Sequence, residues 1–272
     1  MGTGKKALQR CLFLRGIMKR GIGIDIGSSS MKFAVVEDGE LIYKGIYPTG
    51  WSSLDAAKRA EEDLLVHGFD PAVIPCVATG YGRVQVPYAD KRITEISCHA
   101  KGACMLFGLT DGTVIDIGGQ DTKVISVKGG AVNNFVMNDK CSAGTGRFIE
   151  VMANAMGMDP GGLCALAADG SGIVISSMCT VFAESEVVSL IGQGRDRRDI
   201  AYGIVDSIIT KVVTQCGSLG VGSAYYLTGG LSRCPYIAEH LGEKLGKTVV
   251  TMPDAHFAGA AGAALFACDL EK

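Results

Sequence analysis

The chain has 272 residues, of which 47% are hydrophobic, 20% are charged and 38 are glycine, as in a globular chain of one large or two medium domains. The formal net charge of −2 gives no basic field for nucleic acid or a membrane surface, and no apolar run approaches the roughly 20 residues of a membrane span. The ten cysteines are scattered through Val- and Ile-rich segments, so we expect mostly reduced core thiols and a cytoplasmic protein.

Residues 1–20 differ from the rest because six lysines and arginines occur there without an acid, around a short apolar run. That run is too short for the apolar region of a signal peptide. Met18 stands just before the first expected strand. We therefore expect an upstream start and a disordered basic extension; the alternative is a functional arm.

A β-hairpin is predicted next, because isoleucines alternate with small residues from Gly21 to Gly27 and a second strand runs over residues 32–36. Its tip offers backbone N–H groups and the hydroxyls of Ser28 and Ser29 to phosphate oxygens, and Asp25 can hold a metal through water. An ordinary hairpin turn explains the same residues, and this alternative stays open for the hairpin taken alone.

The same pattern recurs 91 residues later. Four positions return as the same residue types: Asp25 as Asp116, Gly27 as Gly118, Lys32 as Lys123 and Val36 as Val127. Two such units imply a duplicated domain whose hairpin tips face one cleft. The second tip carries Gly119, Gln120 and Asp121, which suits orienting water or a metal in addition to phosphate.

Other elements follow from apolar periodicity and glycine positions. We expect helices over 54–67, 148–156, 200–216 and from 259 onward, and strands over 72–78 and 224–227, the latter ending at a Gly229-Gly230 turn.

Cys141 stands directly before the Gly144-Thr145-Gly146 turn and the helix that follows it. The positive end of a helix favours a thiolate or another anion, and the glycines allow close approach of the backbone. Cys179 also precedes a predicted helix, which Thr180 can cap. The alternative for both cysteines is a buried, inert thiol.

The other cysteines show no C-x-x-C spacing and receive no ligand role. Cys98 and His99 are adjacent, so their side chains point apart on a helix or a strand, and we expect a packed helix there rather than a nucleophile and its base. We interpret His256 as a surface or core residue.

Three motifs resemble those of the acetate and sugar kinase, heat-shock chaperone and actin superfamily: Asp25-Ile-Gly-Ser, Asp116-Ile-Gly-Gly-Gln-Asp and Leu227-Thr-Gly-Gly-Leu. Within it, four longer segments, 78–83, 95–100, 138–148 and 179–187, resemble the ATP-dependent activators of 2-hydroxyacyl-CoA dehydratases and related subunits of benzoyl-CoA reductases. The resemblance runs from about residue 20 to the C-terminus. Ser142 and Met178 differ from the usual alanine and threonine of that family.

The resemblance implies an α/β fold of two duplicated actin-like ATPase (ribonuclease H-like) domains with a nucleotide cleft between them. The first domain would cover residues 21–108 with a C-terminal helix over about 256–272, and the second residues 109–255. It also implies a homodimer that shares one [4Fe-4S] cluster, with Cys141 and Cys179 of each chain as ligands. Two cysteines per chain cannot complete a four-cysteine site, which is why the cluster requires a dimer.

The implied activity is ATP hydrolysis coupled to transfer of single low-potential electrons to a separate iron–sulfur dehydratase or reductase, with ferredoxin or flavodoxin as the donor. Asp25, Asp116 and Asp121 would hold Mg²⁺ through water, and Gln120 would position the attacking water. The residues expected to bind ATP or ADP are Gly27, Ser28, Ser29, Lys32, Asp116, Gly118, Gly119, Gly144, Thr145, Gly146, Gly229 and Gly230. A small-molecule kinase without a cluster is the alternative, and a non-catalytic nucleotide-dependent switch is a third possibility.

Overall fold

The computed structural model describes residues 19–176, 179–220 and 222–271. The expected N-terminal extension lies outside the described residues, apart from Lys19 and Arg20. Met178 also lies outside them. None of the described helices is long and apolar enough to cross a membrane.

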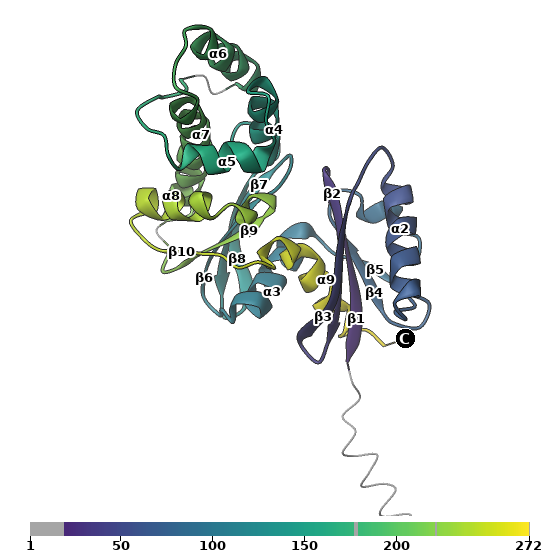
Figure 1. Ribbon diagram of the computed structural model, residues 1–272. Coiled ribbons are helices and arrows are strands. Elements are labelled where there is room, and N and C mark those ends of the chain that lie inside the picture. Colours follow the sequence, from purple (N-terminus) through teal and green to yellow (C-terminus); the bar gives the residue numbers. More distant parts are fainter. Residues whose placement is uncertain (1–18, 177–178, 221, 272) are drawn as a thin grey trace, which may run out of the picture.

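The first lobe is built on a five-stranded sheet of order β3-β2-β1-β4-β5 (Figure 1). Its strands are β1 (Arg20–Ile26), β2 (Ser30–Glu37), β3 (Glu40–Pro48), β4 (Cys76–Thr79) and β5 (Lys91–Arg92). The first three are antiparallel neighbours, and β4 runs parallel to β1. The isoleucines of β1 pack with the buried face of α2 (Ser53–Val66), which the sequence predicts closely.

The second lobe repeats this arrangement in the order β10-β9-β6-β7-β8. Its strands are β6 (Gly112–Ile117), β7 (Thr122–Lys128), β8 (Ala131–Asn138), β9 (Tyr225–Gly229) and β10 (Val249–Val250). Here β6 and β7 are antiparallel, and β9 runs parallel to β6. The α/β class and the two duplicated sheets are therefore confirmed.

The duplication extends beyond the two predicted hairpins. The irregularity between Val35 and Val36 recurs between Ser126 and Val127, again 91 residues later. The turns that lead into β3 and β8 both carry two residues with positive φ, Asp38-Gly39 and Gly129-Gly130. Thus β3 and β8, which the sequence pattern does not predict, belong to the repeat.

Helices α3 (Glu95–Phe107) and α9 (Ala258–Ala267) pack on each other between the two sheets (Figure 1). They cross at glycines: a Cβ added to Gly102 would lie 1.9 Å from the Ala258 carbonyl oxygen, and one added to Gly262 would lie 1.8 Å from that of Cys98. Helix α9 covers the first sheet and α3 covers the second. The small-residue helix expected after residue 259 therefore joins the lobes through close backbone contact.

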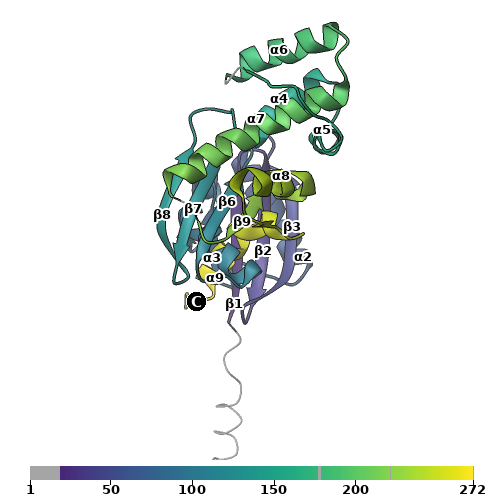
Figure 2. The same cartoon turned by 90° about the vertical axis from the view of Figure 1, so that its left-hand side faces the viewer.

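A layer of helices rises from the second lobe and ends in α6 (Figure 2). It contains α4 (Gly146–Ala155), α5 (Pro160–Ala167), α6 (Thr180–Gly192), α7 (Arg197–Ser218) and α8 (Pro235–Leu245). Short 3₁₀ turns occur at η1 (Arg83–Gln85), η2 (Gly230–Arg233) and η3 (Ala255–Phe257).

Two local predictions are wrong. Cys179, not Thr180, is the N-cap residue of α6, and Thr180 is its first helical residue. The strand expected from residue 72 begins only at Cys76, because a turn occupies the chain between two prolines there. Correcting the cap places Cys179 itself at the start of α6.

Candidate functional site

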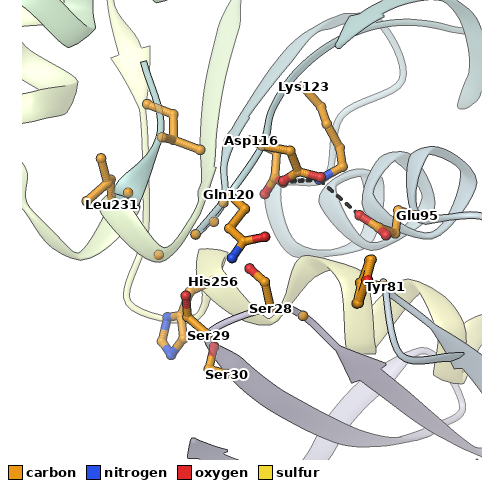
Figure 3. A pocket seen from close by; sticks show the side chains of 18 of the residues that line it. Ser28, Ser29, Ser30, Tyr81, Glu95, Asp116, Gln120, Lys123, Leu231 and His256 are labelled. Atoms are coloured by element: carbon orange, nitrogen blue, oxygen red, sulfur yellow. Dashed lines mark hydrogen bonds and ion pairs between the residues drawn. The ribbon is translucent and has the colours of Figure 1, made fainter. Parts of the chain in front are cut away.

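A cavity of about 440 Å³ opens between the lobes, where the tips of the two duplicated hairpins meet (Figure 3). The predicted nucleotide-site residues that line it are Asp25, Gly27, Ser28, Ser29, Lys32, Asp116, Gly118, Gly119, Gln120, Asp121, Gly146, Gly229 and Gly230. Ser28 and Gln120, one from each tip, point toward each other across it (Figure 3). The fold thus brings segments far apart in the sequence to one cavity.

The buried wall of the cavity holds a charge network centred on Lys123, whose side chain is 3% exposed. Its Nζ lies 2.7 Å from Asp121 Oδ1, 3.0 Å from Glu95 Oε2 and 3.4 Å from Asp116 Oδ2. Burial lowers the pKa of Lys123, but the three carboxylates outweigh burial and raise that pKa. The lysine is therefore a permanent cation.

Asp116 is the most enclosed acid of this wall. Its Oδ1 accepts a hydrogen bond from Thr228 Oγ1 at 2.9 Å and lies 3.3 Å from His99 Nε2. Burial raises the pKa of Asp116, while the charges of His99 and Lys123 and the Thr228 hydroxyl together bring it below its usual value. The carboxylate is held ionised at the edge of the cavity.

Asp25 occupies the equivalent place in the first lobe but has different surroundings. A Cβ added to Gly80 or Gly259 would lie 2.5 or 2.3 Å from one of its carboxylate oxygens, so two glycines make room for this acid. None of the ion pairs found among the described residues includes Asp25 or Lys32. Asp25 and Lys32 are thus available to bind a ligand in the cavity, whereas Asp116 and Lys123 are paired with each other.

The first turn of α4 is fastened to the second hairpin tip. The Gly146 N–H donates to the Gly118 carbonyl at 2.9 Å, and the Arg147 N–H donates to that of Gly119 at 2.7 Å. These two amides are occupied by the tip and so cannot bind phosphate in this arrangement. Gly146 still lines the cavity.

Gly144 and Thr145, expected to contact the nucleotide with Gly146, lie behind the cavity wall. The Gly144 carbonyl accepts a hydrogen bond from Thr122 Oγ1 at 2.6 Å. Thr145 is buried, and its hydroxyl donates to the Ser142 carbonyl at 2.7 Å. Both residues hold the turn in place instead of lining the cavity.

The lining residues that the sequence does not predict as site residues include Tyr81, Glu95, His99 and His256. Glu95 and His99 lie one turn apart on α3, a spacing that is visible in the sequence. Burial lowers the pKa of His256 to about 4, and the nearby Lys32 and Arg233 charges add to this effect. His256 is therefore neutral at pH 7, and its Nδ1 has no hydrogen-bond partner among the described residues.

Cys141 and Cys179 are exposed and do not line the cavity. They belong to adjoining loops, because Ser142 Oγ and Thr180 Oγ1 are 2.7 Å apart. Asn138 shapes the first loop by accepting from the Cys141 N–H and donating to the Cys141 carbonyl. Among the described residues of one chain, no group of three or more His, Cys, Asp or Glu side chains could hold a metal.

Cys98 is fully buried, and burial raises its pKa to about 12. Its neighbour His99 lies instead against Asp116. The adjacent cysteine and histidine are thus parts of a packed helix, as the sequence analysis expects, and the buried thiol is a poor nucleophile.

The sequence matches the BadF/BadG/BcrA/BcrD ATPase family over residues 22–267. The chain belongs to this family. Members similar to it include the (R)-2-hydroxyglutaryl-CoA dehydratase activating ATPase of Acidaminococcus fermentans, 42% identical over 250 residues that make up 90% of this chain and 96% of the relative. The activator of lactoyl-CoA dehydratase of Anaerotignum propionicum is 39% identical over 90% of this chain and 96% of its own.

Solved structures support the same family placement. Component A of the A. fermentans (R)-2-hydroxyglutaryl-CoA dehydratase superimposes with a TM-score of 0.87 at 40% identity, covering 92% of this chain and 98% of its own. The activator of the 2-hydroxyisocaproyl-CoA dehydratase from Clostridium difficile, solved with bound ADPNP, superimposes with a TM-score of 0.86 at 35% identity. It covers 92% of this chain and 94% of its own. A glucokinase from Streptomyces griseus, with a TM-score of 0.58 and 15% identity, shares the fold alone. The predicted actin-like fold is confirmed.

Proposed function

We propose that this protein is an ATP-hydrolysing iron–sulfur protein that passes single low-potential electrons to a partner iron–sulfur enzyme, a 2-hydroxyacyl-CoA dehydratase or a related reductase. Membership of an ATPase family and similarity to dehydratase activators support the ATPase and its coupling to a partner. The observation that carries the electron-transfer half is the pair of exposed cysteines, Cys141 in the loop before α4 and Cys179 at the N-cap of α6, whose loops are joined by the Ser142–Thr180 hydrogen bond.

The cavity fits ATP or ADP with Mg²⁺. Glycines and serines of both tips would surround the phosphates, and Lys32, without an ion-pair partner in the described chain, would neutralise them. Asp25 would hold Mg²⁺ through water together with Asp116 and Asp121. Gln120, whose side chain points toward Ser28 (Figure 3), would orient the attacking water. The Gly229-Gly230 turn would lie against the adenosine.

The two cysteines fit half of a four-cysteine [4Fe-4S] site, so two chains related by a twofold axis would complete it. The cluster would supply a reversible one-electron carrier. Helix α6, directly after Cys179, exposes apolar side chains that an interface of this kind would cover: Val181 at 67%, Phe182 at 67%, Val188 at 54% and Ile191 at 41% exposure. Both observations support a homodimer joined at this end of the molecule.

A continuous set of hydrogen bonds leads from the cavity to the cysteines. Gly118, at the nucleotide tip, accepts from Gly146, and Thr145 donates to the carbonyl of Ser142. Ser142 in turn is hydrogen-bonded to Thr180, the residue after Cys179. Movement of the hairpin tips around ATP would therefore move both cysteine loops, because these hydrogen bonds connect the loops to the tip. This connection gives ATP binding a route to change the environment of the cluster.

Ferredoxin or flavodoxin is the proposed electron donor, and the cytoplasm the proposed compartment. Because an iron–sulfur cluster with exposed ligands is sensitive to oxygen, the proposed activity belongs to anaerobic conditions.

Two cysteine substitutions test the proposal. In anaerobically purified Cys141→Ala or Cys179→Ala protein we expect loss of iron, sulfide and visible cluster absorbance with unchanged ADP affinity, because neither cysteine lines the cavity. Cys104→Ala is the matched control, since Cys104 is partly exposed but lies on α3, where its thiol donates to the Gly130 carbonyl. Retention of a complete cluster in either ligand variant would refute the assignment.

A small-molecule kinase is the alternative, favoured only by the shared fold with the glucokinase. It would bind an acceptor hydroxyl in the same cavity and need no iron. An iron-free protein that phosphorylates a metabolite would establish it.

A further inference from the structure

One acidic residue joins the nucleotide cavity to the loop that carries Cys141. Of residues 138–145, all of which the structure describes, Asp139 alone lines the cavity, although it stands directly before Lys140 and Cys141. In the register of β7 and β8, Asp121 and Asp139 are the next residues beyond the last pair of the two strands. Both carboxylates therefore belong to the part of the cavity at the second hairpin tip.

This part is the acidic end of the cavity. Lys123 Nζ lies 2.7 Å from Asp121 Oδ1 and 3.0 Å from Glu95 Oε2. Glu95 lies across the cavity from Leu231, which follows the Gly229-Gly230 turn (Figure 3). A nucleotide whose adenosine lies against that turn would therefore place its terminal phosphate at the acidic end.

The side chain of Asn138 holds the segment that follows it as one closed turn. Its Oδ1 accepts a hydrogen bond from the Cys141 N–H at 3.2 Å, and its Nδ2 donates to the Cys141 carbonyl at 2.8 Å. The same Nδ2 donates to the Ala143 carbonyl at 3.0 Å. Because a turn closed by three hydrogen bonds moves as a unit, a displacement of Asp139 also displaces Cys141.

The Asp139 carboxylate can respond to charge in the cavity. Its ion-pair partner is Lys140, at 3.2 Å, and because Lys140 is 88% exposed this pair holds the carboxylate only weakly. A phosphate at the acidic end of the cavity would repel Asp139, since like charges at short range oppose each other strongly in a partly enclosed site. Loss of a terminal phosphate removes about two negative charges and this repulsion with them.

We propose that Asp139 is a positioning residue for Cys141 that responds to the charge of the nucleotide's γ-phosphate. The inference rests on the proposed function for the presence of a nucleoside triphosphate in the cavity. With the γ-phosphate present, Asp139 is pushed away from the cavity and carries the turn with it; after its loss, the turn returns. The two nucleotide states therefore hold Cys141 in different positions.

The test compares ADP with ADPNP, each with Mg²⁺, on anaerobically purified protein. In protein that contains iron, we measure the rate at which bathophenanthroline disulfonate removes it. In protein without iron, we measure the rate at which iodoacetamide alkylates Cys141. We expect the two nucleotides to give rates that differ at least about fivefold, the lower end of typical coupling between sites. In Asp139→Asn, which keeps the shape of the side chain and removes its charge, the ratio of the rates should approach unity.

Glu150→Gln is the matched control, because Glu150 also lines the cavity with a partly exposed carboxylate but lies on α4, outside the turn. It should keep the ratio of the unmodified chain. Asp139→Lys should reverse which nucleotide gives the faster rate, an effect that a purely structural role would not produce.

An unchanged ratio in Asp139→Asn, an equal loss in Glu150→Gln, or equal rates with both nucleotides in the unmodified chain would overturn the inference. The alkylation measurement separates it from the proposed function. In a protein without iron, a nucleotide-dependent rate at Cys141 that Asp139→Asn abolishes would support the inference and contradict the iron–sulfur function.

Discussion

Replacing Lys123 with methionine should remove the cation from three carboxylates while keeping the length and apolar part of the side chain. The three acids are Asp116, Asp121 and Glu95, at 3.4, 2.7 and 3.0 Å from Lys123 Nζ. Asp121 and Glu95 are partly exposed and can turn to water, but the Asp116 side chain is 2% exposed and cannot. The cost of the substitution is therefore mainly that of one buried carboxylate left with His99 and Thr228.

Breaking a buried ion pair by removing one partner costs about 3–5 kcal/mol. Because His99 and Thr228 still contact Asp116, we expect the lower end, a loss of about 3 kcal/mol in the free energy of unfolding at pH 7. For a chain of this size that corresponds to a fall of roughly 6–12 °C in the melting temperature. This loss is large enough to separate from the small effects of surface ion pairs.

The loss should depend on pH with a definite sign. In the unmodified protein the folded-state pKa of Asp116 is lowered, so its contribution is present above the unfolded pKa of about 3.9 and is lost as pH falls through the lower, folded-state value. Without Lys123, fewer charges oppose the effect of burial, so the pKa of Asp116 rises and its protonation removes the unpaired charge. The difference in the free energy of unfolding between variant and parent should therefore narrow from pH 7 to pH 5.

Urea unfolding at pH 7 and pH 5, followed by circular dichroism, measures both the loss of stability at pH 7 and its change with pH. Lys101→Met is the control, because the Lys101–Asp269 pair is exposed and should be worth no more than about 1 kcal/mol. If Lys123→Met costs no more than the control, or its cost grows on acidification, the charge network does not stabilise the lobe as described.

Three other substitutions test separate parts of the structure. Gly262→Ala should destabilise the chain by more than about 3 kcal/mol or prevent folding, since its Cβ would lie 1.8 Å from the Cys98 carbonyl oxygen; thermal unfolding measures this. Ser142→Ala should cost only about 1 kcal/mol through loss of the Thr180 hydrogen bond, and should leave the iron content unchanged. In the parent protein the folded-state pKa of His256, about 4, makes the unfolded chain bind more protons between pH 6.5 and 4, so stability falls with pH there. His256→Gln should reduce that fall in the free energy of unfolding by on the order of 1 kcal/mol; urea unfolding across that range checks it.

The sequence predicts the parts of the site that lie on the repeated hairpins. The spacing of Asp25, Gly27 and Lys32 recurs at one offset, and a β-hairpin is a local structure, so the residues at each tip follow directly from the pattern. That the tips meet at one cavity follows from duplication.

The residues that were missed depend on contacts between distant segments. His99 reaches Asp116 from α3, which packs on the second sheet and crosses α9 at glycines, and no local pattern reports that packing. Gly144 and Thr145 do not line the cavity, contrary to the prediction, for another reason. A glycine turn before a helix resembles a phosphate loop, but hydrogen bonds to Thr122 and the Ser142 carbonyl hold this turn behind the cavity wall.

Native mass spectrometry of the anaerobically purified protein tests the central claim most directly, because it reports subunit number and bound iron and sulfide in one species. We predict a dimer that carries one [4Fe-4S] cluster per two chains, and a cluster-free species when Cys141 or Cys179 is replaced. A monomer with its own cluster, or a dimer that binds ADP and contains no iron, would contradict the proposal that the two exposed cysteines share a cluster across a twofold interface.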